Sequence, residues 1–255
     1  MKRLADLLAP VVFVSLLLAG WELACRAFEV PSYRLPPPSA IGEALRESGL
    51  LLLSSGWNTL STALIALAVA SVLASALALL AALSGLIERA IQPVMVTLQV
   101  TPVIAIAPIV QIWAGLAHPE RAVIGLAVVV AFFPIFSGAL TGLKSADPDL
   151  ERLFDLYGAT RRQKLLRLRL PTATPFLLAG HKVAAGLALI GAVVGEFAAG
   201  SGGSQGLAWR IIEASNRLQT AKAFAALFVL AVMGAALYGL LQLAERRALV
   251  WWRGR

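Results

Sequence analysis

The sequence predicts an all-α integral membrane protein with six transmembrane helices, and three observations carry this prediction. The chain of 255 residues is 59% hydrophobic and only 14% charged, whereas a soluble domain of this size needs more polar surface around its core. Its mean hydropathy is +0.80. Its lysines and arginines stand between long apolar runs, a pattern typical of membrane orientation and not of phosphate binding. We therefore expect membrane lipid as a partner and no nucleic acid.

Six apolar stretches are long enough to cross a bilayer, for which a helix needs about 20 mostly apolar residues. The first follows two basic residues, as in a signal peptide. Glu22 stands where a lipoprotein signal before Cys25 needs an apolar residue, so we expect an uncleaved first helix. The expected spans cover residues 8–28, 58–83, 91–115, 121–143, 175–198 and 221–243. They are rich in small residues, which let helix backbones approach closely, and we expect one transmembrane domain over residues 1–255.

The connector between the first two spans is rich in proline. Residues 31–39 contain four prolines, which exclude a helix because proline lacks the amide donor and disfavours helix in the residue before it. Ser39 is then expected to cap a short interfacial helix that ends near Gly49.

The distribution of positive charge orients the chain. With both termini on one side of the membrane, that side has fourteen lysines and arginines and the other side has seven, Lys182 inside the fifth span being left out. An excess of these residues marks the cytoplasmic side. The sequence therefore predicts a multi-pass protein of the bacterial inner membrane with both termini in the cytoplasm.

The longest predicted cytoplasmic loop, residues 144–174, is expected to fold into two short helices around a glycine turn. Pro148 and the acidic residues after it favour a helix start, and Gly158 ends that helix. Thr160 can cap a second, basic and amphipathic helix that runs until Pro171. A basic helix of this kind also suits a surface of anionic lipid, so the residues alone leave a lipid anchor and a docking surface open.

The spacing in this loop resembles the conserved loop of ABC-importer permeases. Gly158, Leu168, Leu170 and Pro171 stand in the spacing of that family's G-x9-I-x-L-P core. The resemblance implies a coupling helix that docks into a cleft on a nucleotide-binding subunit. The residues expected to make that contact are Asp155, Tyr157, Gly158, Ala159, Thr160, Arg161, Leu170 and Pro171. The family's Glu-Ala-Ala opening is missing, since Arg152, Leu153 and Phe154 occupy its place.

The likeness extends along most of the chain. The segments that resemble the nitrate, sulfonate and taurine branch of these permeases are PPPSAI (36–41), TPVIAIAPIVQIWAG (101–115) and FFPIFSGALTGLKSADPDL (132–150). Residues 182–197 and 223–227 are most similar to permeases for pyrimidine precursors of thiamine. The resemblance implies a type I ABC-importer permease fold and a translocation path for a sulfonate-, taurine- or nitrate-like anion or for a pyrimidine precursor.

The same resemblance implies partners. It implies a homodimer of permease copies, two ATP-binding subunits and a periplasmic solute-binding protein. ATP and Mg²⁺ would bind to the ATPase subunit, while this chain would bind no cofactor or metal and catalyse no reaction. The glycine-rich segment GSGGSQG (200–206) agrees with this, because it lacks the Lys-Ser/Thr ending of a phosphate loop.

Polar residues inside the spans are candidates for the path, because such groups are costly in a bilayer and usually face the bundle interior or a water-filled cavity. The candidates are Gln99, Thr101, Gln111, Ser137 and Glu196. Glu196, near the periplasmic end of the fifth span, is open to two interpretations, a gate or solute contact and a hydrated carboxylate at the membrane surface. Lys182 is expected to extend its amine to the interface. An ion-coupled secondary transporter stays the alternative, although that class typically shows internal repeats, which this sequence lacks.

Overall fold

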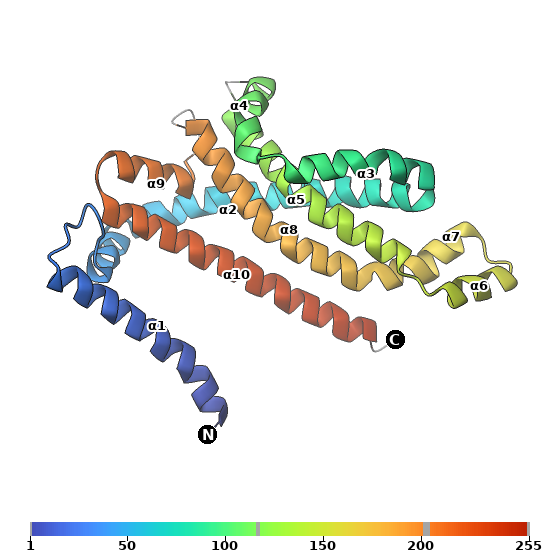
Figure 1. Cartoon of the computed structure of the whole chain (residues 1–255), viewed down its shortest axis with the longest axis horizontal. Coiled ribbons are helices and arrows are strands. Elements are labelled where there is room, and N and C mark those ends of the chain that lie inside the picture. Colours follow the sequence, from blue (N-terminus) through green and yellow to red (C-terminus); the bar gives the residue numbers. More distant parts are fainter. Residues whose placement is uncertain (1, 116–117, 201–204, 254–255) are drawn as a thin grey trace. The chain divides into compact units, whose positions relative to one another are not determined.

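The computed structural model describes residues 2–115, 118–200 and 205–253, and these residues are almost entirely helical (Figure 1). In chain order the helices are α1 (Lys2–Ala27), α2 (Pro38–Leu83), α3 (Gly85–Val100), α4 (Val103–Ala114), α5 (Pro119–Lys144), α6 (Pro148–Leu156), α7 (Arg161–Lys164), the π-helical turn η1 (Leu165–Arg169), α8 (Leu170–Ala199), α9 (Leu207–Asn216) and α10 (Thr220–Arg253). Within the described residues, five helices are long and apolar enough to cross a membrane, or six if the bent pair α3–α4 forms one span. The predicted all-α membrane fold is confirmed.

The chain groups into two compact units, Met1–Asn58 with Gln205–Val232 and Thr59–Ser204 with Met233–Arg255. In the first unit, the Glu22 carboxylate accepts hydrogen bonds from the Ser39 backbone amide at 3.0 Å and from its hydroxyl at 2.8 Å. These bonds join α1 to the start of α2. The prediction that Ser39 caps a separate helix is therefore wrong, since its hydroxyl is bonded to α1 instead.

Helix α2 corrects a second boundary. It runs for 46 residues from Pro38 to Leu83, where the sequence predicted a short helix to Gly49 and a separate span from residue 58. A glycine inside a helix costs about 1 kcal/mol relative to alanine. Four leucines follow Gly49 directly, and leucine is a strong helix former, so the helix continues through the glycine.

The third predicted span is broken. Helices α3 and α4 meet at an angle of 105°, and Thr101 between them is extended, with ψ of 125°. Proline disfavours the helical conformation in the residue before it, so Pro102 forces Thr101 out of the helix. Pro108 lies inside α4 without ending it. The expected single helix over residues 91–115 is thus two helices with a sharp bend.

Helices α5 and α8 run side by side and form the centre of the second unit (Figure 1). Their backbones touch at five glycines: Gly138, Gly142, Gly180, Gly191 and Gly195. A Cβ atom added to Gly180 would lie 2.7 Å from the Pro134 carbonyl oxygen, and one added to Gly191 would lie 2.7 Å from Ala127 Cα. Only glycine permits this approach. We call these five residues and the backbone that they meet the α5–α8 seam.

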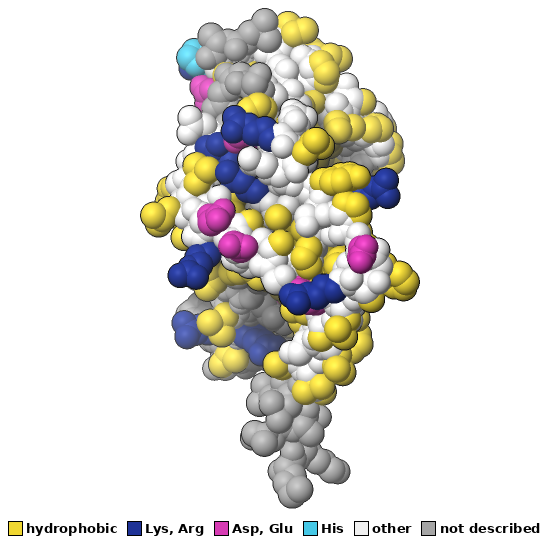
Figure 2. Space-filling view, turned by 90° about the vertical axis from the view of Figure 1, so that its left-hand side faces the viewer, with side chains coloured by type: hydrophobic (Ala, Val, Ile, Leu, Met, Phe, Trp, Pro, Cys, Tyr) yellow, Lys and Arg dark blue, Asp and Glu magenta, His cyan; other side chains and the backbone are white. Residues whose placement is uncertain are grey.

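Lys182 has a protein partner. Its Nζ lies 2.5 Å from Glu245 Oε2 on α10, within the second unit. A carboxylate 63 residues away in the sequence thus satisfies the charge of Lys182, and its predicted place at the membrane interface stays a prediction. On the face of the molecule drawn in Figure 2, basic and acidic side chains are spread among hydrophobic ones.

Candidate functional site

Helix α6 opens the predicted coupling loop with well-formed ends. Asp147 caps its start, since Oδ1 accepts a hydrogen bond from the Asp149 amide at 2.8 Å. Pro148 holds the first helical position, where its missing amide costs nothing. The helix ends at a turn in which Gly158 has φ of +66°, a left-handed conformation that favours glycine. The predicted start and stop of this helix are both confirmed.

The second loop helix begins as predicted but does not stop where predicted. Thr160 Oγ1 accepts from the Gln163 amide, and Gln163 Oε1 accepts from the Thr160 amide at 2.7 Å, which is a capping box. The helix then passes through the π turn η1 into α8 without an interruption at Pro171. The Leu170 amide donates to the Leu165 carbonyl, five residues back. A π turn is wider than an α turn, which makes room for the Pro171 ring where a regular helix would clash with it.

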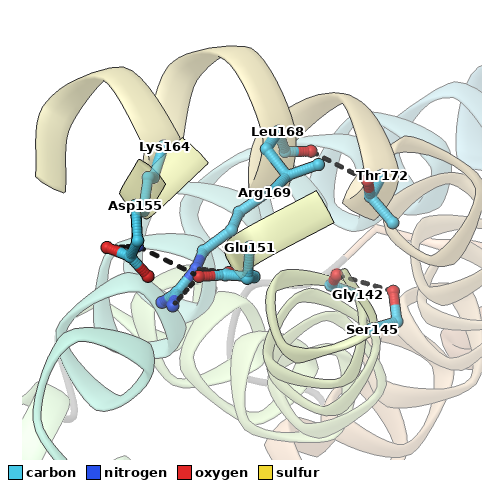
Figure 3. A network of polar contacts seen from close by, with 8 residues as sticks. All are labelled: Gly142, Ser145, Glu151, Asp155, Lys164, Leu168, Arg169 and Thr172. Atoms are coloured by element: carbon cyan, nitrogen blue, oxygen red, sulfur yellow. Dashed lines mark hydrogen bonds and ion pairs between the residues drawn. The ribbon is translucent and has the colours of Figure 1, made fainter. Parts of the chain in front are cut away.

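Ion pairs brace the loop from inside (Figure 3). Arg169 donates to both carboxylate oxygens of Glu151, from Nε at 2.6 Å and from Nη2 at 3.2 Å. Lys164 Nζ lies 2.5 Å from Asp155 Oδ1 and 3.8 Å from Glu151 Oε2. The hydrogen bonds from Arg169 lower the pKa of Glu151 below its ordinary value. These four side chains tie α6 to the helix that continues into α8.

The turn between the two loop helices exposes large apolar side chains. Leu156 and Tyr157 are 85% and 83% exposed. The charged residues of α6 form ion pairs within the loop: Asp149 with Arg152, Glu151 with Arg169 and Asp155 with Lys164. An exposed apolar patch of this kind marks an interaction site. We call residues 156–161 the exposed turn.

The residues predicted to contact the ATPase lie in two different places in the structure. Tyr157, Gly158, Ala159, Thr160 and Arg161 come together on the exposed turn. Asp155 is also exposed, but its carboxylate is paired with Lys164.

Leu170 and Pro171 lie elsewhere, at the start of α8 beyond the π turn. Sequence reasoning missed the bracing residues Glu151, Lys164 and Arg169. The sequence did contain a signal for these ion pairs, because the first loop helix carries an acidic residue and the second carries basic residues.

A cavity of about 590 Å³ lies among α3, α4, α5 and α8 in the second unit. Two predicted path residues, Gln99 and Ser137, line it together, and Thr141 adds another hydroxyl. The other lining residues are apolar or glycine: Leu98, Val103, Val129, Val130, Phe133, Pro134, Gly138, Phe176, Ala179, Gly180, Val183 and Leu187. The lining of this cavity, as far as the structure describes it, contains no charged side chain.

The other predicted path residues do not line this cavity. Thr101 lies at the α3–α4 bend, where its hydroxyl donates to the Thr97 carbonyl at 2.6 Å. Gln111 lies on α4, and its buried Nε2 has no hydrogen-bond partner among the described residues. Glu196 is 1% exposed and accepts a hydrogen bond from Thr59 Oγ1 at 2.8 Å. Its burial excludes a hydrated carboxylate at the membrane surface.

Two further features bear on chemistry. The described residues hold no group of three or more His, Cys, Asp or Glu side chains that could bind a metal ion. Residues 201–204 of the glycine-rich segment lie outside the described residues.

Comparison with known proteins decides the family. Residues 70–250 match the family described as the inner membrane component of binding-protein-dependent transport systems. The chain belongs to this family. The permease is 34% identical to the formylaminopyrimidine transport permease protein ThiX of Halalkalibacterium halodurans, over 98% of both chains.

Other relatives carry different names. The permease is 32% identical to the riboflavin transport system permease protein RibX of Chloroflexus aurantiacus, over 94% of this chain and 88% of that one. It is 28% identical to a putative aliphatic sulfonates transport permease protein SsuC of Bacillus subtilis, over 96% and 86%. The permease is accordingly a multi-pass transmembrane subunit of an ABC transporter. The comparisons do not support the alternative of an ion-coupled secondary transporter.

Proposed function

We propose that this permease forms the translocation path of an importer, as a homodimer that binds two ATP-binding subunits and receives solute from a periplasmic binding protein. It lies in the bacterial inner membrane with both termini in the cytoplasm, and ATP and Mg²⁺ bind to the ATPase subunit. The observation that carries the proposal is the exposed turn, residues 156–161, whose Leu156 and Tyr157 side chains are 85% and 83% exposed on a loop braced by the Glu151–Arg169 and Asp155–Lys164 ion pairs.

The loop is built to transmit movement. The exposed turn leads into α8 through continuous helix, and the Glu151–Arg169 ion pair fixes α6 to that helix. The α5–α8 seam then makes α5 follow α8, because no side chain separates their backbones. Both helices line the 590 Å³ cavity. Closure of the ATPase subunits therefore moves α5 and α8 together, and the cavity changes shape because its other walls come from α3 and α4.

The solute binds in this cavity on Gln99 and Ser137. The relatives whose names state a solute include permeases for formylaminopyrimidine, riboflavin and aliphatic sulfonates. The solute of this permease belongs to the range expected from its sequence, a sulfonate-, taurine- or nitrate-like anion or a pyrimidine precursor. A role in the path for Thr101, Gln111 and Glu196, which lie outside the cavity lining, stays a prediction.

Substitution of Gly158 tests the coupling role. Gly158→Trp places a bulky side chain on the exposed turn at a φ of +66°. We expect it to abolish either assembly with the ATPase subunit or the stimulation of ATP hydrolysis by loaded binding protein, measured with the purified complex. Gly158→Asn is the matched control, because asparagine tolerates the left-handed conformation and adds little bulk.

The two variants separate backbone strain from docking. We expect Gly158→Asn to keep most of the stimulated hydrolysis. Wild-type stimulation in the Gly158→Trp complex would contradict the assignment of this loop as the coupling element.

A further inference from the structure

A second, smaller cavity continues from the first. It has a volume of about 230 Å³. Its walls come from α3 and α5: Glu88, Gln92, Met95, Val96, Phe133, Phe136, Ser137, Leu140 and Thr141. Phe133, Ser137 and Thr141 line both cavities. The two cavities therefore adjoin along one wall of α5, and that wall carries two hydroxyl groups.

The polar residues of both cavities form two stripes at helical spacing. On α3, Glu88, Gln92 and Gln99 are separated by four and seven residues, and all three line a cavity. Such spacing places side chains on one face of a helix. The stripe extends over twelve residues, or about 16 Å along the axis.

The facing stripe on α5 contains Ser137 and Thr141, which line both cavities, and Lys144 three residues further on, which lines neither. We call these three residues, together with Glu88, Gln92 and Gln99, the polar track. Polar groups in a membrane-spanning helix are costly and commonly mark a substrate pathway. Helix packing alone does not call for two such stripes on the same cavities.

An ion pair closes one end of the polar track. Lys144 Nζ lies 2.7 Å from Glu88 Oε1 and 2.8 Å from Glu88 Oε2. Lys144 is the last residue of α5 and the first residue of the coupling loop, residues 144–174. A movement of that loop relative to α3 acts first on this pair.

The lining of the large cavity favours an uncharged solute over an anion. Its described lining offers one amide, two hydroxyls and the rings of Phe133 and Phe176, and no charged side chain. An anion bound there would therefore meet no cationic partner among the described lining residues. An uncharged solute with a ring and a few hydrogen-bonding groups can use every one of these contacts.

Resting on the proposed transport function, we propose that the polar track is the route by which an uncharged solute leaves the large cavity, and that the Glu88–Lys144 ion pair closes its end. Gln92 and Thr141 are then solute contacts beyond those that the sequence indicated. This selects the uncharged pyrimidine-like class over sulfonate-like anions.

Cysteine labelling of the complete transporter in lipid nanodiscs tests the closure. The chain has one cysteine, so Cys25→Ser gives a background for single cysteines. We expect Thr141→Cys to react with a small uncharged methanethiosulfonate roughly fivefold faster when Glu88→Gln breaks the pair, the scale expected for loss of a half-exposed ion pair. The charge swap Glu88→Lys with Lys144→Glu should restore the slow rate. Val94→Cys, which is 55% exposed and lines neither cavity, should react at one rate in all backgrounds.

A second comparison tests the charge preference with Ser137→Cys. The probes are an uncharged and an anionic methanethiosulfonate of similar size, and their rates are divided by those with free cysteine in solution. We expect the uncharged probe to be favoured at least about tenfold, which corresponds to about 1.4 kcal/mol. Equal normalised rates would overturn the assignment of an uncharged solute.

The labelling results are independent of coupling. Equal Thr141→Cys rates with and without Glu88→Gln, or a charge swap as reactive as the single variant, would overturn the closure by the ion pair. Loss of ATPase assembly on the wild-type chain would instead overturn the proposed function, because labelling requires neither transport nor ATP hydrolysis.

Discussion

Glu196 and Thr59 form a buried polar contact between α8 and α2. Their side chains are 1% and 0% exposed, and the Thr59 hydroxyl donates to the Glu196 carboxyl at 2.8 Å. Removing one member of a buried hydrogen bond leaves the other with a desolvation penalty of about 1–3 kcal/mol. The contact therefore stabilises the second unit, whatever further part Glu196 has in transport.

We predict that Glu196→Ala destabilises the permease by about 1–3 kcal/mol, whereas Glu196→Gln costs less because its amide oxygen can still accept from Thr59. Thermal unfolding in detergent measures both. Thr59→Val is the companion variant, and a double-mutant cycle isolates the pair. Additive effects of the two substitutions would show that the hydrogen bond does not carry the stability of this contact.

Sequence reasoning located two of the five predicted path residues on one cavity, and their role in the path stays a prediction. Gln99 and Ser137 were expected on the path because polar groups are costly in a bilayer, and the structure brings them to one cavity. Thr141 was missed because a hydroxyl inside an apolar run can satisfy itself on a helix carbonyl, which weakens the signal. The burial of Glu196 could not be predicted, since its partner Thr59 stands 137 residues away in the sequence.

At the scale of elements, two glycines of α8 test the α5–α8 seam. Gly191 belongs to the seam, and Gly186 lies outside it. A Cβ at Gly191 would lie 2.7 Å from Ala127 Cα, whereas a Cβ at Gly186 would meet nothing within 4 Å. We predict that Gly191→Ala destabilises by about 1–3 kcal/mol, as overpacking does, while Gly186→Ala is neutral or slightly stabilising. Denaturation midpoints of the purified variants test this, and equal midpoints would exclude a rigid seam.

The loop pair Glu151–Arg169 predicts a dependence on pH. Because Arg169 lowers the pKa of Glu151 below the ordinary carboxyl value of 4.5, the pair stabilises the loop fully above that value. The contribution fades as the pH falls through the lowered pKa of the folded state. We predict that the difference in melting temperature between the wild type and Glu151→Gln shrinks as the pH is lowered from about 7 toward about 3.5.

A control for this prediction lies on the same helix. Asp149 pairs with Arg152, and the two side chains are 83% and 79% exposed. Exposed ion pairs contribute little, so Asp149→Asn, which loses only this pair and its favourable position in the first turn of α6, should lower the melting temperature at neutral pH less than Glu151→Gln does. A gap for Glu151→Gln that stays constant with pH would contradict the assigned role of the ion pair.

Some helix ends were predicted correctly from the sequence, and others were not. The start of α6, the Gly158 turn and the Thr160 cap were predicted correctly because each depends on neighbours within a few residues. Helix α2 was divided too early, and the second loop helix was ended too early at Pro171. In both cases neighbouring residues let the helix continue through a residue that usually ends one. Four leucines follow Gly49, and a π turn precedes Pro171.

At the scale of the whole molecule, topology is the property most open to test. The excess of lysine and arginine on one side predicts that both termini face the cytoplasm. Reporter fusions after Arg46, Leu156 and Gln205 should read outside, inside and outside. Any other order would contradict the proposed orientation, and with it the placement of the exposed turn beside a cytoplasmic ATPase.

The α5–α8 seam has a consequence for the entropy of folding. Glycine and alanine lose no side-chain rotamer freedom when they become buried, and the seam brings five glycines against backbone and small side chains. In lipid, helices gain no hydrophobic driving force from meeting one another, so dispersion between close backbones must hold them together. At this seam that attraction is not opposed by the ordering of long side chains. The centre of the second unit is therefore held by many weak contacts between formed helices, and packing these helices orders few side chains.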